Sequence, residues 1–231
     1  MERVVSAEEI YQVLEDEIVD LKLLPGEVIS ENQCCKRFGV SRTPVRSALQ
    51  RLEQNGFVDI LPHRGTVVTP IDVGTVNQLI YQRVAVETMV LRDFILVATP
   101  LAVERVRCSL LELQAAGVIG DPASFDIYRF LRQDLAMHRI WFEETEKTFL
   151  WERLIAPHPD YSRFIRLDII GAQNVPDVLV KHAEMMRIID EKDLDAIEPM
   201  IRAHLYGGVR RMGSKLFGVD ARDYARYFRQ G

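Results

Sequence analysis

The 231-residue sequence predicts a mainly α-helical protein with an N-terminal domain over residues 1–70 and a C-terminal domain over residues 71–231. Strand-like runs and turn residues are confined to the first 70 residues. After Pro70, apolar residues recur at spacings of three and four, which is typical of helices in an antiparallel bundle. The chain is 48% hydrophobic and 27% charged, which is ordinary for a packed protein and argues against disorder.

The N-terminal domain is predicted to contain three helices and a hairpin. The helices cover residues 7–22, 31–38 and 42–54, and each follows a serine that can cap it: Ser6, Ser30 and Ser41. Pro44 lies in the first turn of the third helix, where its missing N–H costs little. Two strands over 57–60 and 66–69 flank the turn Pro62-His63-Arg64-Gly65. Helix, helix, turn, helix and hairpin is the layout of a winged helix-turn-helix.

The C-terminal domain is predicted to be an all-α antiparallel helical bundle. Its first helix is long and ends at Ala98, with Val76, Ile80, Val84 and Leu91 on its apolar face. Further helices are predicted over residues 101–116, 122–145, 147–155, 160–171, 176–191 and 194–213. Glycines and prolines mark the breaks between them: Gly117, Gly120, Pro157, Pro159 and Pro176.

Composition excludes several classes of protein. The net charge of −5 excludes a uniformly basic nucleic-acid coat, although a local basic patch remains possible. No apolar run reaches the ~18 residues of a membrane helix, and the N-terminus lacks the layout of a signal peptide. The three cysteines, with Cys34 and Cys35 adjacent, do not resemble a disulfide framework, so we expect a cytoplasmic protein without membrane contact. We interpret Cys34 and Cys35 as helix packing, with a redox sensor as the alternative.

Positive charge is concentrated on the second and third predicted helices. Between Asn32 and Leu52 the chain has five cations and no acid: Lys36, Arg37, Arg42, Arg46 and Arg51. A recognition helix enters the major groove by its N-terminal end, so Arg42 and Arg46 are placed to reach base edges or phosphates. The start of the same helix, with Ser41 and Thr43, can hold a phosphate. At the hairpin tip, we expect DNA contacts from His63, Arg64 and Gly65.

Five cations alone are more typical of a solvated surface. Their combination with Gly39-Val40-Ser41, the first-turn Pro44 and a basic hairpin tip favours DNA binding.

Two pairs of residues in the C-terminal domain suggest a metal site. Asp134 and His138 are four residues apart on one predicted helix, so both can face one ion. His182 and His204 lie on two further helices. Taken singly, each histidine is more often an ordinary polar residue, and spacing alone favours only the Asp134/His138 pair. Together, three imidazoles and a carboxylate would suit Zn or Ni.

The N-terminal motif is specific enough to identify a family. Pro25-Gly26, the run Phe38-Gly39-Val40-Ser41-Arg42-Thr43-Pro44-Val45-Arg46, and Arg64-Gly65 resemble the DNA-binding domain of the GntR family of bacterial transcription regulators. The resemblance covers about residues 7–70. It implies that Arg42, Arg46 and the hairpin tip contact the operator. Asn32 stands where many members have a further arginine, which puts that contact in doubt.

The C-terminal motifs are similar to the FCD-type ligand-binding domain of the FadR subfamily. They are Asp134-Leu135-Ala136-Met137-His138, Lys181-His182-Ala183 and His204-Leu205, within residues 72–213. The resemblance implies a helical bundle, a metal held by Asp134, His138, His182 and His204, and a small organic acid as effector. It makes Arg83 the first candidate for binding the acid. Asn174 is a separate candidate for a polar lining residue, which the resemblance does not supply. Tyr81, Arg132, Arg163 and Arg166 are weaker candidates. Lys181 replaces a usual glutamate, and Pro199 lies inside the last helix.

Three functions follow as hypotheses. The leading one is a ligand-responsive transcription regulator, more a repressor than an activator, that binds a palindromic operator as a homodimer. The second keeps DNA binding and makes the metal purely structural. The third is a metal-dependent hydrolase or lyase, in which Glu143, Glu144 or Glu184 would be the base. None of these glutamates lies in a recognised catalytic motif, so we expect a regulator and not an enzyme.

Overall fold

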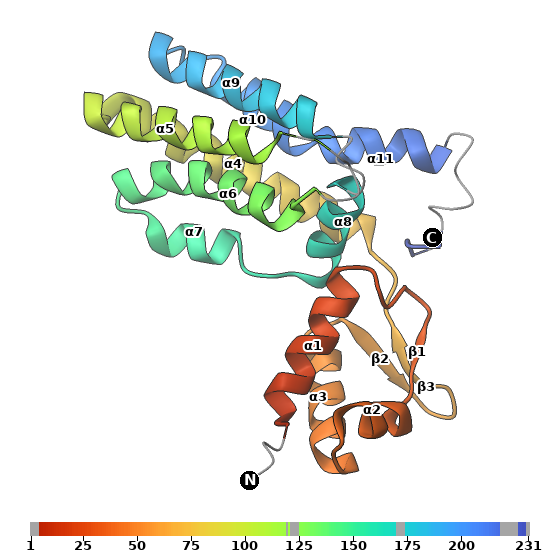
Figure 1. Cartoon of the computed structure of the whole chain (residues 1–231). Helices are drawn as coiled ribbons and strands as arrows, with labels where there is room; N and C mark the ends of the chain where they lie inside the picture. Colours follow the sequence, from red (N-terminus) through yellow and green to blue (C-terminus); the bar gives the residue numbers. More distant parts are fainter. Residues whose placement is uncertain (1–4, 119, 121–124, 170–173, 218–225, 230–231) are drawn as a thin grey trace. The chain divides into compact units, whose positions relative to one another are not determined.

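The computed structural model describes residues 5–118, 120, 125–169, 174–217 and 226–229. These described residues form eleven helices and one three-stranded sheet, which confirms the predicted mainly α-helical class (Figure 1). The chain divides into two compact units. One contains Met1–Val76, Pro157–Leu167 and Ser214–Gly231, and the other contains Asn77–Ala156 and Asp168–Gly213. Among the described helices, none has the length together with the apolar run that a bilayer crossing requires.

The first unit contains the predicted winged helix-turn-helix. Its elements are α1 (Ala7–Val19), β1 (Val28–Ile29), α2 (Glu31–Phe38), α3 (Arg42–Gln54), β2 (Val58–Leu61) and β3 (Gly65–Val68). All strands pair antiparallel, in the order β1-β3-β2. The sequence analysis missed β1, because two residues are too few to show strand alternation.

Two of the three predicted serine caps are present. Ser6 and Glu9 form a reciprocal capping box at α1, and Ser30 accepts from the Gln33 amide at α2. The prediction for Ser41 was wrong in one respect. Ser41 occupies the N-cap position of α3, but its side chain makes no capping hydrogen bond with the described residues.

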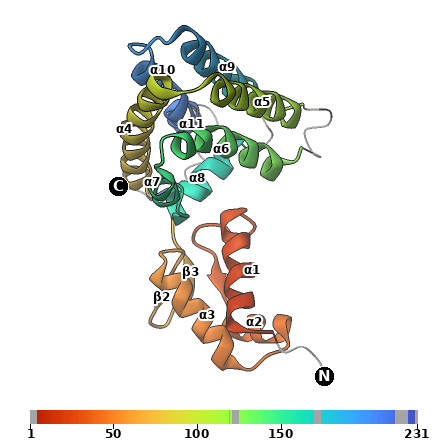
Figure 2. The same ribbon diagram turned by 90° about the vertical axis from the view of Figure 1, so that its left-hand side faces the viewer.

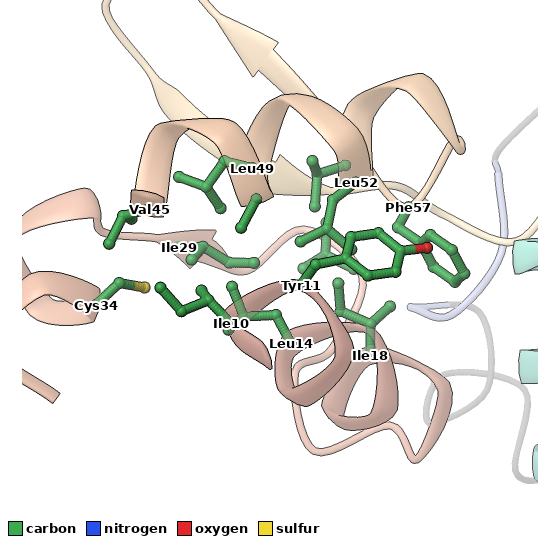
Figure 3. Close-up of a cluster of buried hydrophobic side chains, with 13 residues drawn as sticks. Ile10, Tyr11, Leu14, Ile18, Ile29, Cys34, Val45, Leu49, Leu52 and Phe57 are labelled. Carbon is green, nitrogen blue, oxygen red and sulfur yellow. The ribbon is translucent and has the colours of Figure 1, made fainter. Parts of the chain in front are cut away.

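The core of this unit lies between α1 and α3 (Figure 3). Ile10, Leu14 and Ile18 of α1 are buried together with Leu49 and Leu52 of α3, as their spacing predicted. Figure 3 shows Cys34 beside these side chains, and only 6% of its surface is exposed. Burial raises the pKa of the Cys34 thiol, which disfavours the reactive thiolate. Packing, and not redox sensing, is therefore the interpretation that the structure favours for Cys34.

Eight further helices follow the sheet. They are α4 (Val73–Val97), α5 (Pro100–Ala116), α6 (Ile127–Glu144), α7 (Thr148–Leu154), α8 (Pro159–Ile169), α9 (Val175–Glu191), α10 (Ile197–Leu205) and α11 (Gly207–Phe217). Figure 2 shows α4 along one edge of the second unit. The predicted helix start at residue 122 and end at residue 171 lie outside the described residues.

The predicted last helix over 194–213 was wrong, because it is two helices. α10 ends at Leu205 and α11 begins at Gly207, where Gly207 and Gly208 are adjacent. Glycine carries a high conformational cost inside a helix, so a break at this pair is favourable. Pro199 is the third residue of α10, where its missing N–H removes no helical hydrogen bond.

Close packing between α5, α6 and α9 positions the helix that carries His182. Gly117 ends α5, as predicted, and a side chain there would lie 3.0 Å from Leu179 and 3.3 Å from Phe130. Phe130 and Val178 belong to the same buried cluster. Glycine at this position therefore allows α5 to end against α9 and α6.

Candidate metal centre and DNA-binding surface

The second unit brings the four predicted metal ligands together. Asp134 and His138 come from α6, His182 from α9 and His204 from α10. The candidate ligand atoms of all four residues lie within 4.8 Å of one another. Two of these side chains, those of His138 and His182, are completely buried.

Nitrogen and oxygen atoms of these residues face one point. Nε2 of His138 lies 3.1 Å from Nε2 of His182, which in turn lies 3.2 Å from a carboxylate oxygen of Asp134. The ring of His204 is 5.3 Å from that of His138 and 4.7 Å from that of His182, measured between centroids. Such a set of three imidazoles and one carboxylate is the donor type that late divalent metals prefer.

Outer partners fix how two of the imidazoles are oriented. Nδ1 of His182 lies 2.8 Å from the Val178 carbonyl oxygen, which can only accept a hydrogen bond. Nδ1 of His138 lies 2.6 Å from Glu87 of α4. Each ring therefore donates through Nδ1 and leaves the Nε2 lone pair for the cluster, the arrangement typical of a metal-binding histidine.

The charge state of the cluster also suits a cation. Burial alone would raise the pKa of Asp134, but the neighbouring imidazoles of His182, His138 and His204 bring it well below its usual range. Burial, together with the neighbouring His182 and His138, lowers the pKa of His204 well below its ordinary value. An ionised carboxylate and a neutral imidazole are the protonation states that bind metal. The residues present therefore fit a divalent ion.

Glu87 was missed by the sequence analysis. Its side chain is fully buried, and its second oxygen lies 2.6 Å from Nε of Arg83. Burial tends to raise the pKa of Glu87, but Arg83 and His138 outweigh it and lower the pKa. An Arg and a Glu four residues apart are usually a solvent-exposed helix pair, so their spacing does not indicate that this pair is internal.

The two predicted effector residues lie in the same unit and have protein partners. Arg83 is buried and held by Glu87, which places it one side chain away from His138. Asn174 is 2% exposed and donates to Asp168, while its Oδ1 has no hydrogen-bond partner among the described residues.

The weaker effector candidates are either exposed or belong to the first unit. Tyr81 and Arg132 are exposed. Arg163 and Arg166 belong to the first unit, where Arg163 donates to Thr69 and Arg166 pairs with Asp20.

The proposed bases of the enzyme hypothesis are in ion pairs with arginines. Glu143 and Glu144 pair with Arg105, and Glu184 pairs with Arg187. Burial tends to raise the pKa of Glu143, but the arginine partners lower the pKa of both Glu143 and Glu184, which weakens these two carboxylates as bases.

In the first unit, the N-terminal end of α3 presents the predicted recognition residues. Arg42 and Arg46 are exposed, and so are Ser41 and Thr43. Both arginines pair with Glu31 of α2, through contacts of 3.4 Å to Arg42 and 2.8 Å to Arg46. Asn32 accepts a hydrogen bond from Arg42 at 3.2 Å. Glu31 of α2 thus pairs with two arginines of the adjacent helix α3. This contact could not be predicted from the sequence alone, because it depends on how the two helices pack.

Two other arginines of the basic helices, Arg37 and Arg51, form contacts with α1. Arg37 pairs with Glu17 of α1. Arg51 pairs with Glu8 and stacks 4.0 Å from the ring of Tyr11. These two arginines hold α2 and α3 against α1.

The hairpin between β2 and β3 exposes His63, Arg64 and Gly65 at its tip. His63 has φ +64° and Gly65 has φ +83°. Glycine adopts such a φ at little cost, and the tight turn carries both basic side chains outward.

Comparison with known proteins shows which family contains a chain with these two sites. Residues 6–68 match the family described as bacterial regulatory proteins, gntR family, and residues 78–207 match the FCD domain. The chain belongs to the GntR family and carries an FCD domain. It is a DNA-binding transcription regulator and not an enzyme.

Sequence similarity to known regulators extends over most of this chain. The HTH-type transcriptional repressor RspR of Escherichia coli K12 is 28% identical over 203 residues, which is 86% of this chain and 85% of RspR. An HTH-type regulator from an unstable DNA locus of Streptomyces ambofaciens is 29% identical over 219 residues, covering 92% and 90% of the two chains.

Two solved structures show the same fold. A GntR transcriptional regulator from Rhodococcus sp. RHA1 has a TM-score of 0.63 at 19% identity, covering 90% of this chain and 98% of that one. McbR/YncC of E. coli has a TM-score of 0.62 at 15% identity, covering 92% and 99%.

Proposed function

We propose that this GntR regulator senses a small organic acid through a divalent metal bound in its FCD domain. The observation that carries the proposal is the convergence of Asp134, His138, His182 and His204 within 4.8 Å. The Val178 carbonyl and Glu87 support it, because they orient two of the imidazoles toward the cluster. Zn and Ni are the metals that this donor set favours.

A bound metal would supply a positive charge and open coordination positions for a carboxylate. Arg83 is the proposed second anchor, since a guanidinium binds a carboxylate through two parallel hydrogen bonds. Glu87 already holds Arg83, so the acid has to share the guanidinium or displace Glu87 from it. Asn174 is the proposed polar lining residue, and its buried Oδ1 can accept a hydrogen bond.

For DNA, we propose that Arg42 and Arg46 reach base edges while Ser41 and Thr43 contact phosphate. His63, Arg64 and Gly65 contact the flanking groove or backbone. We further propose that two copies bind the two halves of a palindromic operator, because two-fold operators match two-fold proteins. Repression is favoured because the similar protein RspR is described as a repressor. These roles place the protein in the cytoplasm, with the DNA.

Regulation follows only if the acid binds one arrangement of the two DNA-binding units more tightly than another. The first test is metal content by mass spectrometry on the wild-type protein and on the Asp134→Ala/His138→Ala double variant. We expect about one divalent ion per chain in the wild type and none in the variant. Equal metal in both would contradict the assigned site.

The second test uses an operator selected from random DNA by the purified protein. Its affinity is measured with metal present, with and without a panel of hydroxy acids and sugar acids. We expect one acid class to weaken binding of the wild type and to have no effect on the double variant. If metal binds but no acid changes operator affinity, the metal is structural, and the second hypothesis replaces the first.

A further inference from the structure

The segment that follows the DNA-binding hairpin pairs with residues far along the chain. Residues 69–72, the junction segment, connect β3 to α4. Within it, Ile71 forms a parallel β-bridge with Phe228. The Ile71 N–H donates to the Tyr227 carbonyl at 2.8 Å, and the Ile71 carbonyl accepts from the Arg229 N–H at 2.9 Å. Both backbone groups of one junction residue are therefore bonded to residues 226–229.

Side chains on both sides support this pairing. Ile71 is completely buried, and only 8% of Phe228 is exposed. The Arg229 guanidinium donates to one carboxylate oxygen of Asp72 at 3.3 Å. The other oxygen of Asp72 accepts from two N–H groups in the first turn of α4. The ion pair is largely exposed and contributes little by itself, so the backbone bonds and the buried apolar pair carry the contact.

The rest of the junction segment is also hydrogen-bonded. Pro70 has no N–H. The Thr69 N–H donates to the Phe57 carbonyl at 3.1 Å, and the Asp72 N–H donates to Asp160 of α8 at 2.9 Å. Connections between domains are usually exposed and flexible. This one has every backbone N–H bonded within the first unit, to which α8 up to residue 167 and residues 226–229 also belong.

We propose that residues 226–229 are a clamp that removes a hinge beside the DNA-binding domain. A flexible connection has to be ordered each time two copies engage the two halves of an operator, which costs conformational entropy. A clamped connection is already ordered in the free protein. The inference rests on the homodimer and the palindromic operator of the proposed function, and it assigns these residues a role in operator affinity.

The clamp predicts a difference between two DNA probes. A single half-site engages one DNA-binding domain, and the position of the second copy does not matter to it. A full palindrome requires both domains in register. Loss of the clamp lowers the effective concentration of the second domain at its half-site. It should therefore weaken binding to the palindrome and leave binding to the half-site unchanged.

The test uses the full-length protein with Phe228→Asp, which puts a charge into the buried pair. Phe149→Asp is the matched control, because it makes the same change at a phenylalanine of α7 that is 65% exposed. Hydrogen exchange followed by mass spectrometry reports on the junction and on α1. We expect exchange over residues 69–76 to be at least about tenfold faster in Phe228→Asp, with α1 unchanged. The control should match the wild type in both regions.

Fluorescence anisotropy then compares the operator selected from random DNA with a duplex that contains one half-site. We expect Phe228→Asp to bind the operator about tenfold more weakly and the half-site within about twofold of the wild type. A second variant closes the clamp covalently. Ile71→Cys/Phe228→Cys, with Cys108→Ser to remove the exposed thiol, should form a disulfide, because bridge partners lie close enough. Its operator affinity should fall when the disulfide is reduced.

Each failure has its own meaning. Unchanged exchange over residues 69–76 in Phe228→Asp, or no disulfide in the cysteine variant, would show that the clamp does not exist. Faster exchange in α1 as well would make residues 226–229 part of the folding core and overturn the clamp. Equal losses for operator and half-site would remove its role in operator binding. If the wild type binds the palindrome no more tightly than the half-site, the homodimer of the proposed function is wrong, and the inference fails with it.

Discussion

A carboxylate oxygen of Glu87 lies 2.6 Å from Nδ1 of His138, and its other oxygen lies 2.6 Å from Arg83. Both side chains of the first contact are completely buried. Glu87 therefore connects a candidate metal ligand with the candidate effector anchor. Because the carboxylate accepts the Nδ1 proton, it also selects the tautomer in which Nε2 faces the cluster.

Replacing Glu87 by Gln should weaken metal binding by about 10- to 100-fold, since an outer carboxylate both orients the imidazole and raises its basicity. The measurement is competition with a chromophoric chelator for Zn. Asp168→Asn is the matched control, because Asp168 is also a buried carboxylate paired with an arginine, Arg211. Equal affinities for the two variants would show that Glu87 has no specific effect on the site.

Arg46 and Arg37 provide a matched pair on the basic helices. Arg46→Ala should reduce affinity for the selected operator at least about tenfold, because a base contact is lost. Arg37→Ala should leave it within about twofold, since Arg37 is committed to Glu17 of α1. Fluorescence anisotropy at one fixed salt concentration measures both affinities. The recognition-helix assignment is wrong if the two variants lose affinity equally.

Glu31 competes with DNA for the same two arginines. DNA phosphates have to replace its contacts with Arg42 and Arg46, so Glu31→Gln should tighten binding to non-specific DNA by about threefold to tenfold. Glu8→Gln is the control. It removes the same charge from a glutamate that pairs with Arg51 on α3 and should have a smaller effect. An equal gain in both variants would mean that net charge alone is responsible.

Local patterns predicted the helices and the Asp134/His138 pair, and the family resemblance added His182 and His204 as ligands. Neither predicted the contacts between elements. Apolar spacing was sufficient for α1 and α3, because their buried faces repeat over three turns. The break between α10 and α11 was missed since Ile201, Leu205 and Met212 continue an apolar pattern across it. Glu87 and Glu31 were missed for another reason. Each acts on a residue of a different helix, and no spacing along the chain reports such a contact.

Backbone groups next to the end of β3 are held by side chains from α8. Arg163 is completely buried and donates to the Thr69 carbonyl and, at 3.2 Å, to the Thr69 hydroxyl. It also donates to the Pro159 carbonyl at 2.8 Å. Asp160 accepts from the Asp72 amide at 2.9 Å. The segment after β3 is thus fixed by hydrogen bonds within the first unit.

Arg163→Met should therefore destabilise this unit by about 3 kcal/mol, because the Thr69 carbonyl loses its charged donor and Asp160 loses an ion-pair partner at 3.3 Å. Urea unfolding followed by circular dichroism gives the free energy, and proteolysis should cut near residues 69–72 faster in the variant. Arg202→Met is the control. Arg202 is 48% exposed and pairs with Glu198 within α10, so its loss should cost less than about 1 kcal/mol. A cost for Arg163→Met no larger than that of the control would show that these hydrogen bonds do not stabilise the segment.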